Sequence, residues 1–272
     1  MIIHPMTTST TPSITTSVTT LNHLGVIHAR GEDAAQFLHN QFTQDVLLMP
    51  AGHNTPSRLA AWCSPKGRML ASFTVFKRAK DDILLVCSRD LLAPTLQRLK
   101  MFVLRAKVQL SDATADFTVY GIVNGAALEL AVQPVADAPP AGTPLPEGQW
   151  EWLSVRSGIA TITAPIVDKY VPQMLNYESI GGVNFKKGCY PGQEVVARSQ
   201  FRGTLKRRAF IIHSDTPLAV GAEILESASV VQSAANPEGG FDAIVCVQLA
   251  DLEALQQQFT FIPLPYALVE DV

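Results

Sequence analysis

Residues 58–77 read "RLAAWCSPKGRMLASFTVFK" and predict two antiparallel strands. Between the two apolar runs, "SPKG" (64–67) places proline and glycine where a tight turn favours them. A second turn at 80–82 leads into the apolar strand "ILLVCS" (83–88). Leucines then recur at helical spacing from Leu92 to Val103, and "AKVQL" (106–110) returns as a strand. This β-β-α-β order predicts an antiparallel sheet with helices on one face, which is an α+β fold.

The segment before this sheet predicts one strand, one helix and an uncharged tail. "LGVIHA" (24–29) alternates like a strand, and a helix follows through about Gln41. Residues 1–29 contain no Lys, Arg, Asp or Glu, and residues 7–20 are mostly Thr and Ser. We expect residues 1–20 to be a disordered Thr/Ser-rich tail, the alternative being an extended arm packed on the body. A secretory or organellar leader would require basic residues that this segment lacks.

The second half of the chain predicts mostly strands. Residues 133–149 hold five prolines and neither Lys nor Arg, which is typical of a loop. "WEWLSVRSGIATIT" (150–163) predicts further strand structure. Past Arg208 the chain consists of short apolar runs broken by Pro and Gly, with a helix only near 250–258. This pattern predicts a small all-β C-terminal domain.

Composition limits the functions that the chain can have. Hydrophobic residues make up 47% of the chain and its net charge is −3, so we expect a globular protein without general attraction to nucleic acid or anionic membranes. No apolar run is long enough to span a membrane. The four cysteines are far apart, with no CxxC pair and no Cys/His cluster. We therefore expect no metal site and reduced thiols in a cytoplasmic protein.

The stretch "KKGCYPGQE" (186–194) carries the strongest chemical signal. From Lys186 to Arg208 there are seven basic residues against one acid, a local charge of +6, which leaves −9 for the rest of the chain. Such a patch can meet a carboxylate-rich small molecule, a phosphate or RNA, or it can be a solvated turn. Cys189 is expected just ahead of a helix, where the helix dipole and two lysines favour the thiolate. The residues alone leave a reactive and a structural cysteine equally open.

The whole stretch "KKGCYPGQEVVARSQFRGTLKRR" resembles the signature of the YgfZ family, folate-binding relatives of the glycine cleavage T-protein, an aminomethyltransferase. That signature is K-G-C-Y/F-x-G-Q-E followed by R-G-x-x-K-R, and every position matches. Further similarity lies in "FLHNQFTQDV" (37–46), "AAWCSPKGRM" (60–69), "GGVNFKKGC" (181–189) and "PLPY" (263–266). The resemblance thus spans roughly residues 21–272.

The resemblance implies a fold, a cofactor and partners. Residues 21–200 would form a T-protein-like, ring-shaped region of two interleaved α+β subdomains, and residues 201–272 a small C-terminal β-barrel. Tetrahydrofolate or a derivative would bind in a central cavity. The family role is to assemble or maintain iron–sulfur clusters, including those of enzymes that thiomethylate tRNA, so the implied partners are iron–sulfur client or assembly proteins. Direct RNA contact is not favoured, because the basic stretch offers few aromatic residues for stacking.

The resemblance also assigns site residues. Cys189 is the position most tied to function, and it would lie beside the folate cavity. Around it the signature comprises Lys187, Gly188, Tyr190, Gly192, Gln193, Glu194, Arg198 and Arg202. The aromatic residue expected to line the folate cavity falls on Trp150. A second aromatic, expected in the first strand, falls on Leu24.

Aminomethyl transfer is not expected. The T-protein has an acidic pair where this sequence has Ala71 and Ser72, and neither residue can act as a general acid near neutral pH. Three alternatives stay open. The first is a folate-dependent one-carbon transferase with another acid. The second is an RNA-binding module using the 186–208 patch, and the third is a cysteine-nucleophile enzyme whose histidine is distant in sequence.

Overall fold

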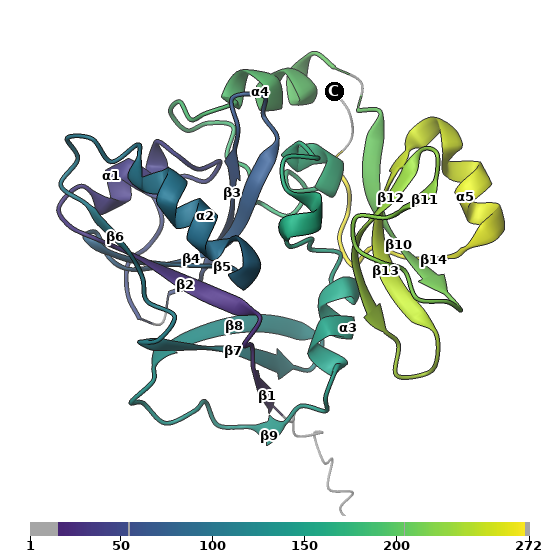
Figure 1. Ribbon diagram of the computed structural model, residues 1–272, viewed down its shortest axis with the longest axis horizontal. Helices are drawn as coiled ribbons and strands as arrows, with labels where there is room; N and C mark the ends of the chain where they lie inside the picture. The colour runs from purple at the N-terminus through teal and green to yellow at the C-terminus, as the bar shows by residue number, and fades with distance from the viewer. Residues whose placement is uncertain (1–15, 54, 204, 270–272) are drawn as a thin grey trace, which may run out of the picture.

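The computed structural model describes residues 16–53, 55–203 and 205–269, and it contains three sheets arranged around a common centre (Figure 1). The sequence-based expectation of disorder for residues 1–15 lies outside the described residues. The observed architecture is a mixed α and β fold with antiparallel sheets and few helices. Of the helices in the described residues, none combines the length and apolar composition that crossing a bilayer requires.

The sheet predicted from residues 58–77 is the first of the three, with strand order β3-β4-β5-β2-β6 and antiparallel pairing throughout. Its strands are β2 (Leu24–Arg30), β3 (Arg58–Cys63), β4 (Met69–Ala79), β5 (Asp82–Ser88) and β6 (Gln109–Asp112). Helices α1 (Ala34–His39) and α2 (Arg89–Lys100) cover one face. These elements confirm the predicted order, although β6 begins at Gln109 rather than at residue 106.

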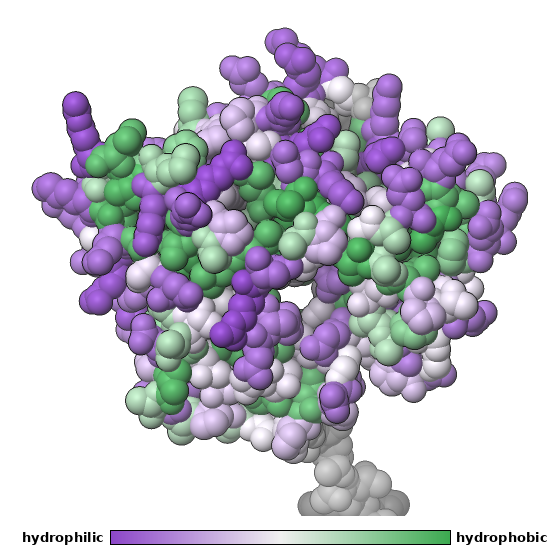
Figure 2. Space-filling model, in the orientation of Figure 1, coloured by the Kyte–Doolittle hydropathy of each residue, from purple (hydrophilic) through white to green (hydrophobic). Residues whose placement is uncertain are grey.

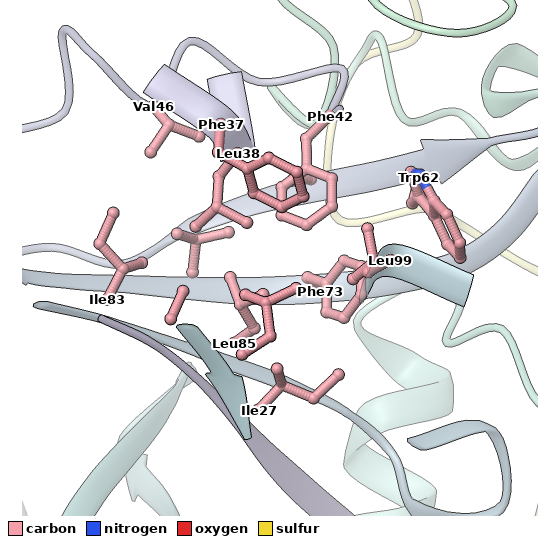
Figure 3. Packing of buried hydrophobic residues seen from close by; sticks show 14 of the residues in the cluster. Ile27, Phe37, Leu38, Phe42, Val46, Trp62, Phe73, Ile83, Leu85 and Leu99 are labelled. Carbon is pink, nitrogen blue, oxygen red and sulfur yellow. The ribbon is translucent and has the colours of Figure 1, made fainter. Parts of the chain in front are cut away.

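Alternation along the strands gives this sheet two apolar faces. Ile27, Phe73 and Leu85 pack with Phe37 and Leu99 of the two helices (Figure 3). The intervening residues of the same strands pack in the opposite direction, against the second sheet and α3 (Gln149–Arg156). The second face therefore has no helical cover from α1 or α2, and it contributes to the centre of the molecule.

The second sheet has the order β8-β7-β1-β9. Its strands are β1 (Thr16–Thr20), β7 (Phe117–Asn124), β8 (Ala127–Pro134) and β9 (Thr143–Pro144). From β1 the chain therefore passes into the first sheet, completes it and then returns to the second sheet at β7. Strand β1 corrects the expected tail: order begins by Thr16, because Thr16–Thr20 pair along their full length with β7. For these residues the packed-arm alternative is the right one.

The third sheet has the order β11-β12-β13-β10-β14. Its strands are β10 (Arg207–Ser214), β11 (Glu223–Leu225), β12 (Ala228–Ala235), β13 (Phe241–Gln248) and β14 (Thr260–Ile262). Helix α5 (Leu252–Gln258) confirms the single helix expected near 250–258. The expected β-barrel is not confirmed, because within the described residues no ladder joins the edge strands β11 and β14, and the sheet is open.

The strand prediction for residues 150–163 is wrong, because Gln149–Arg156 form helix α3. Gly148 has a φ of +73° at its start, a conformation that suits glycine. The sequence "WEW" alternates as a strand would, but in a helix the same spacing sends the two tryptophans to different sides. Trp150 packs toward the second sheet, and Trp152 reaches the third. The remaining helices are α4 (Gln193–Phe201), η1 (Ala164–Ile166), η2 (Pro172–Leu175) and η3 (Leu249–Asp251).

Candidate functional site

A cavity of about 920 Å³ lies where the three sheets and α3 meet. Its wall includes Thr74 of β4, Val86 of β5, Leu130 of β8 and Gln232 of β12. In the space-filling view a narrow opening passes through the molecule near this centre (Figure 2). The volume is that of a small-molecule site, and the wall combines apolar side chains with a few polar ones.

Trp150 lies in the cavity wall, and its place is set by a glycine of the neighbouring sheet. The indole packs directly on Gly121 of β7, where a Cβ would overlap the ring. Only 8% of Trp150 is exposed. One side of the indole ring is thus fixed against β7. The packing of α3 on the second sheet therefore places Trp150 in the wall of the cavity.

Leu24 lines the same cavity. It is the first residue of β2, opposite Ser88 at the end of β5, and Ser88 is also in the wall. The structure thus brings together Trp150 and Leu24, which are far apart in sequence. Their role as folate contacts stays a prediction.

Polar groups of the wall include two that have no partner within the described protein. Gln133 Oε1 and Thr163 Oγ1 are buried and unpaired. Two glutamates, Glu129 and Glu151, also line the cavity, and Glu151 Oε1 lies 3.9 Å from Nδ1 of His23. The wall thus combines apolar side chains with two carboxylates that can accept hydrogen bonds.

Lys187 anchors the signature loop, residues 186–194. Lys187 is buried, and its Nζ donates hydrogen bonds to the carbonyl oxygens of His39, at the end of α1, and Phe42, just beyond it. The ammonium also lies 4.6 Å from the ring centre of Tyr190, which is itself buried. Burial lowers the pKa of Lys187 to about 8. Lys187 is therefore a structural tether, and the lysine that faces solvent is Lys186.

Gly192 holds the loop against the turn between β3 and β4. It has a φ of +79°, and a Cβ there would overlap the backbone of Ser64 and Gly67. Gln193 N donates to Tyr190 O at 3.2 Å, which closes the turn that starts α4. The expected helix after the cysteine is confirmed. On it Glu194 and Arg198 are exposed, as is Arg202 at its end.

Cys189 is exposed on this loop, and neither it nor any other residue of 186–194 lines the cavity. Lys187 ties the loop to the end of α1, and the functional role expected for Cys189 stays a prediction. Sequence reasoning also missed a nearby histidine. A Cβ at Gly188 would lie 3.4 Å from Nε2 of His39, whose Nδ1 lies 3.1 Å from Oδ1 of Asp45. The motif "FLHNQFTQD" contains both residues, but nothing in it indicates that they approach the loop.

No protein-family model matches the chain. The chain is 28% identical to an uncharacterized protein of Haemophilus influenzae, with 92% of this chain and 98% of that protein covered. It is 24% identical to the tRNA-modifying protein YgfZ of Yersinia enterocolitica, with 98% and 97% covered. It is 29% identical to the tRNA-modifying protein YgfZ of Colwellia psychrerythraea, with 71% and 70% covered. The chain is YgfZ-like.

The solved structures agree on the fold. The glycine cleavage system aminomethyltransferase T of Bartonella henselae is similar, with a TM-score of 0.64 and 12% sequence identity, over 87% of this chain and 79% of that one. This YgfZ-like protein therefore has a T-protein-like fold. At this identity the similarity concerns the fold alone.

The positions to which the resemblance assigns an acidic pair are Ala71 and Ser72 in this YgfZ-like chain, and neither side chain carries a carboxylate. Ser72 lines the cavity, and its Oγ accepts a hydrogen bond from Ile162 N at 2.9 Å. Ala71 is buried in the core beneath α1 and α2. Asp82 lies at the other end of β4, opposite Ala79, and is hydrogen-bonded to His28 and Arg78. The carboxylates that do line the cavity are those of Glu129 and Glu151.

The structure divides the basic stretch of the YgfZ-like chain into buried and exposed residues. Lys187 and Arg208 are buried, and Arg208 forms a 2.9 Å ion pair with Glu178. The exposed ones are Lys186, Arg198, Arg202 and Lys206, and Arg207 is partly exposed. Of the aromatic residues in this stretch, Tyr190 is buried, whereas Phe201 is 57% exposed. The surface patch is thus smaller than the sequence suggested.

Cys63, Cys87 and Cys246 are buried, and burial raises the pKa of each to about 12. Within the described part of the chain, no group of three or more His, Cys, Asp and Glu side chains is placed to hold a metal ion.

Proposed function

We propose that this protein binds tetrahydrofolate or a derivative in the central cavity and supports the assembly or maintenance of iron–sulfur proteins, and through them tRNA modification. One observation carries the proposal: Trp150 and Leu24, assigned to the ligand by resemblance, line one cavity of about 920 Å³. Several relatives are named tRNA-modifying proteins, which supports the cellular part of the proposal.

The wall has the chemistry that a pterin needs. Leu24, Val86 and Trp150 offer apolar surface for the flat ring. Donors on the ring find acceptors in the wall, including the carboxylate of Glu151. The anionic glutamate tail is best placed toward the opening, because the charged residues of the wall are two glutamates and, when protonated, His23 and His53.

Cys189 acts outside the cavity in this account. Its exposed place between Lys186 and α4 suits contact with another macromolecule. One cysteine cannot hold an iron–sulfur cluster alone. The proposed partners at this face are therefore iron–sulfur client or assembly proteins in the cytoplasm, which bring their own ligands.

The cellular proposal is tested in a strain that lacks this protein. Thiomethylated adenosine in total tRNA is measured by mass spectrometry after expression of wild type, Trp150→Ala, Cys189→Ala or Glu253→Ala, the last an exposed control on α5. Wild type and the control should restore the modification, and the other two should not. Full restoration by both Trp150→Ala and Cys189→Ala at equal protein levels would contradict the proposal.

A folate-dependent one-carbon transferase is the second candidate function. The observation that favours it is the pair of glutamates in the cavity wall, because a carboxylate near the folate nitrogens is what this transfer requires. The two candidates differ in turnover. With tetrahydrofolate and an aminomethyl donor, the accessory protein should form no methylenetetrahydrofolate above background. Product formation that Glu151→Gln abolishes would establish the transferase instead.

A further inference from the structure

The turn that follows α2 exposes three large apolar side chains within four residues. Met101 is 67% exposed, Phe102 41% and Leu104 89%. Figure 2 shows apolar surface, bordered by hydrophilic residues, on the side of the molecule where α2 ends in Figure 1. Single apolar residues on a surface are ordinary, whereas a contiguous exposed group marks an interaction site. These three residues are called the apolar patch below.

The backbone holds the apolar patch outward. Val103, between Phe102 and Leu104, packs against the core of the first sheet, and its carbonyl oxygen accepts a 2.8 Å hydrogen bond from Ala106 N. Leu104 has a φ of +41°, a conformation that is unfavourable for a residue with a Cβ. A strained backbone that exposes a leucine does not stabilise the isolated chain, and this combination points to a partner.

Cations surround the apolar patch. Residues 91–111 contain four basic residues and neither Asp nor Glu. One of the four, Lys107, has an acidic partner 2.9 Å away. The other three, Arg98, Lys100 and Arg105, are exposed, and in the described part of the chain none of them forms an ion pair. These three residues, the basic rim, are complementary to an acidic surface.

Buried aromatic residues connect the apolar patch to the signature loop. Phe102 lies edge-on against Trp62 of β3, with 6.4 Å between the ring centres. Trp62 forms a β-bridge with Phe42, whose carbonyl oxygen accepts a 2.9 Å hydrogen bond from Lys187 Nζ. The apolar patch and the signature loop thus rest on the same pair of packed residues.

The chemistry of the apolar patch favours a protein partner over RNA or a lipid surface. RNA bases stack on aromatic side chains, and Phe102 is the single aromatic residue of the apolar patch. Stable membrane attachment takes two strong signals, more than three apolar side chains and three cations supply. Protein interfaces, by contrast, combine an apolar centre with a polar rim and are enriched in methionine, phenylalanine and arginine.

We propose that the apolar patch and the basic rim form a docking surface for a protein that presents an apolar groove bordered by Asp and Glu. Met101 and Leu104 enter the groove, and the basic rim pairs with its border. This inference rests on the proposed function, because the partner is an iron–sulfur client or assembly protein. It gives that partner a contact surface besides the loop that carries Cys189.

Photo-crosslinking in living cells tests the surface. The full chain with Leu104→p-benzoylphenylalanine is expressed in the strain that lacks this protein, and the cells are irradiated. Mass spectrometry should identify a protein adduct whose crosslinked peptide lies beside Asp or Glu residues. Reversing the basic rim (Arg98→Glu, Lys100→Glu and Arg105→Glu) should lower the adduct yield about tenfold or more. Val135→p-benzoylphenylalanine, at an apolar residue 58% exposed outside the apolar patch, is the matched control and should not give this adduct.

The functional arm uses Leu104→Gly. Glycine tolerates a positive φ, so the melting temperature should stay the same or rise while the apolar side chain is lost. Thiomethylated adenosine in tRNA should fall below the wild-type level at equal protein amounts, and Val135→Ala should restore it fully. Affinity for tetrahydrofolate should not change, because the residues of the apolar patch do not line the cavity.

The outcomes separate this inference from the proposed function. If wild type restores the modification and both Leu104→Gly and the reversed rim do so fully, the docking surface is wrong and the proposed function stands. An adduct with RNA or with a second copy of this chain, or binding to phosphatidylglycerol vesicles that rim reversal abolishes, would also overturn it. If wild type fails to restore the modification, the proposed function fails and the client partner fails with it. An acidic-peptide adduct that rim reversal removes would then still support the surface.

Discussion

At the scale of single residues, Lys187 explains why a basic signature motif contains a buried lysine. Its ammonium group satisfies two carbonyl oxygens, that of His39 at the end of α1 and that of Phe42 just beyond the helix. Helix ends leave such carbonyls unpaired, and a cation near a helix C-terminus is favourable. The sequence alone could show that the loop is basic. It could not show which lysine is exposed, because the partner carbonyls come from a segment about 150 residues earlier.

Replacing Lys187 by methionine should destabilise the protein by about 1–3 kcal/mol at pH 7, because two buried carbonyls lose their donor. Urea unfolding measures the difference. Lys186→Met, at the exposed neighbour, should change stability by less than about 0.5 kcal/mol. Equal stability of Lys187→Met and wild type would contradict a stabilising role of the Lys187 hydrogen bonds.

The comparison of wild type with Lys187→Met also gives a prediction for the pH dependence of stability. Burial lowers the pKa of Lys187 from 10.5 to about 8, so between these values the unfolded chain binds a proton that the folded protein has released. Stability from this group therefore rises with pH across that window. The stability advantage of wild type over Lys187→Met should be larger at pH 9.5 than at pH 7. A smaller advantage at pH 9.5 would show that the pKa is not lowered.

At the scale of elements, α3 joins two sheets. Trp150 packs on β7, and Trp152 Nε1 donates a 2.7 Å hydrogen bond to Oδ2 of Asp242 on β13. Asp242 is fully buried and also accepts from His213 and Asn236. Alternation of apolar residues in 150–155 predicted a strand. This prediction is wrong because local patterning carries no information about two separate packing partners. Tertiary contacts decided the conformation instead.

Asp242→Asn should weaken the contact between α3 and the third sheet and so lower the stability of the protein. The carboxylate is the shared acceptor of the network, and breaking a buried charged pair typically costs about 3–5 kcal/mol. Burial opposes ionisation, but the bonds from His213, Trp152 and Asn236 lower the pKa of Asp242 below 3.8. Its stabilising contribution is therefore complete above pH 3.8 and is lost as the pH falls through the lowered pKa.

Urea unfolding at pH 7, 5 and 3 measures this effect. The advantage of wild type over Asp242→Asn should be the same at pH 7 and 5 and smaller at pH 3. Asp215→Asn, at a fully exposed carboxylate, should have little effect. An advantage that already disappears at pH 5 would mean that the network does not hold the carboxylate ionised.

At the scale of the whole molecule, the cavity is built from segments that the sequence keeps far apart. Patterning predicted the first sheet with α1 and α2 and the strands of the C-terminal region, because each is specified by local alternation and turns. The resemblance supplied Trp150 and Leu24. Neither could reveal that Cys189 is absent from the cavity wall, because the residues of that wall depend on how three sheets meet.

The measurement that tests the central claim most directly is a calorimetric titration of the wild-type protein with tetrahydrofolate, repeated with Trp150→Ala and Cys189→Ala. The account predicts binding by wild type and a loss of affinity of about tenfold or more for Trp150→Ala. Affinity should be unchanged for Cys189→Ala, because Trp150 lines the cavity and Cys189 does not. Circular dichroism confirms that the variants are folded. Absence of binding by wild type, or equal affinity for a folded Trp150→Ala, would contradict a folate site in this cavity.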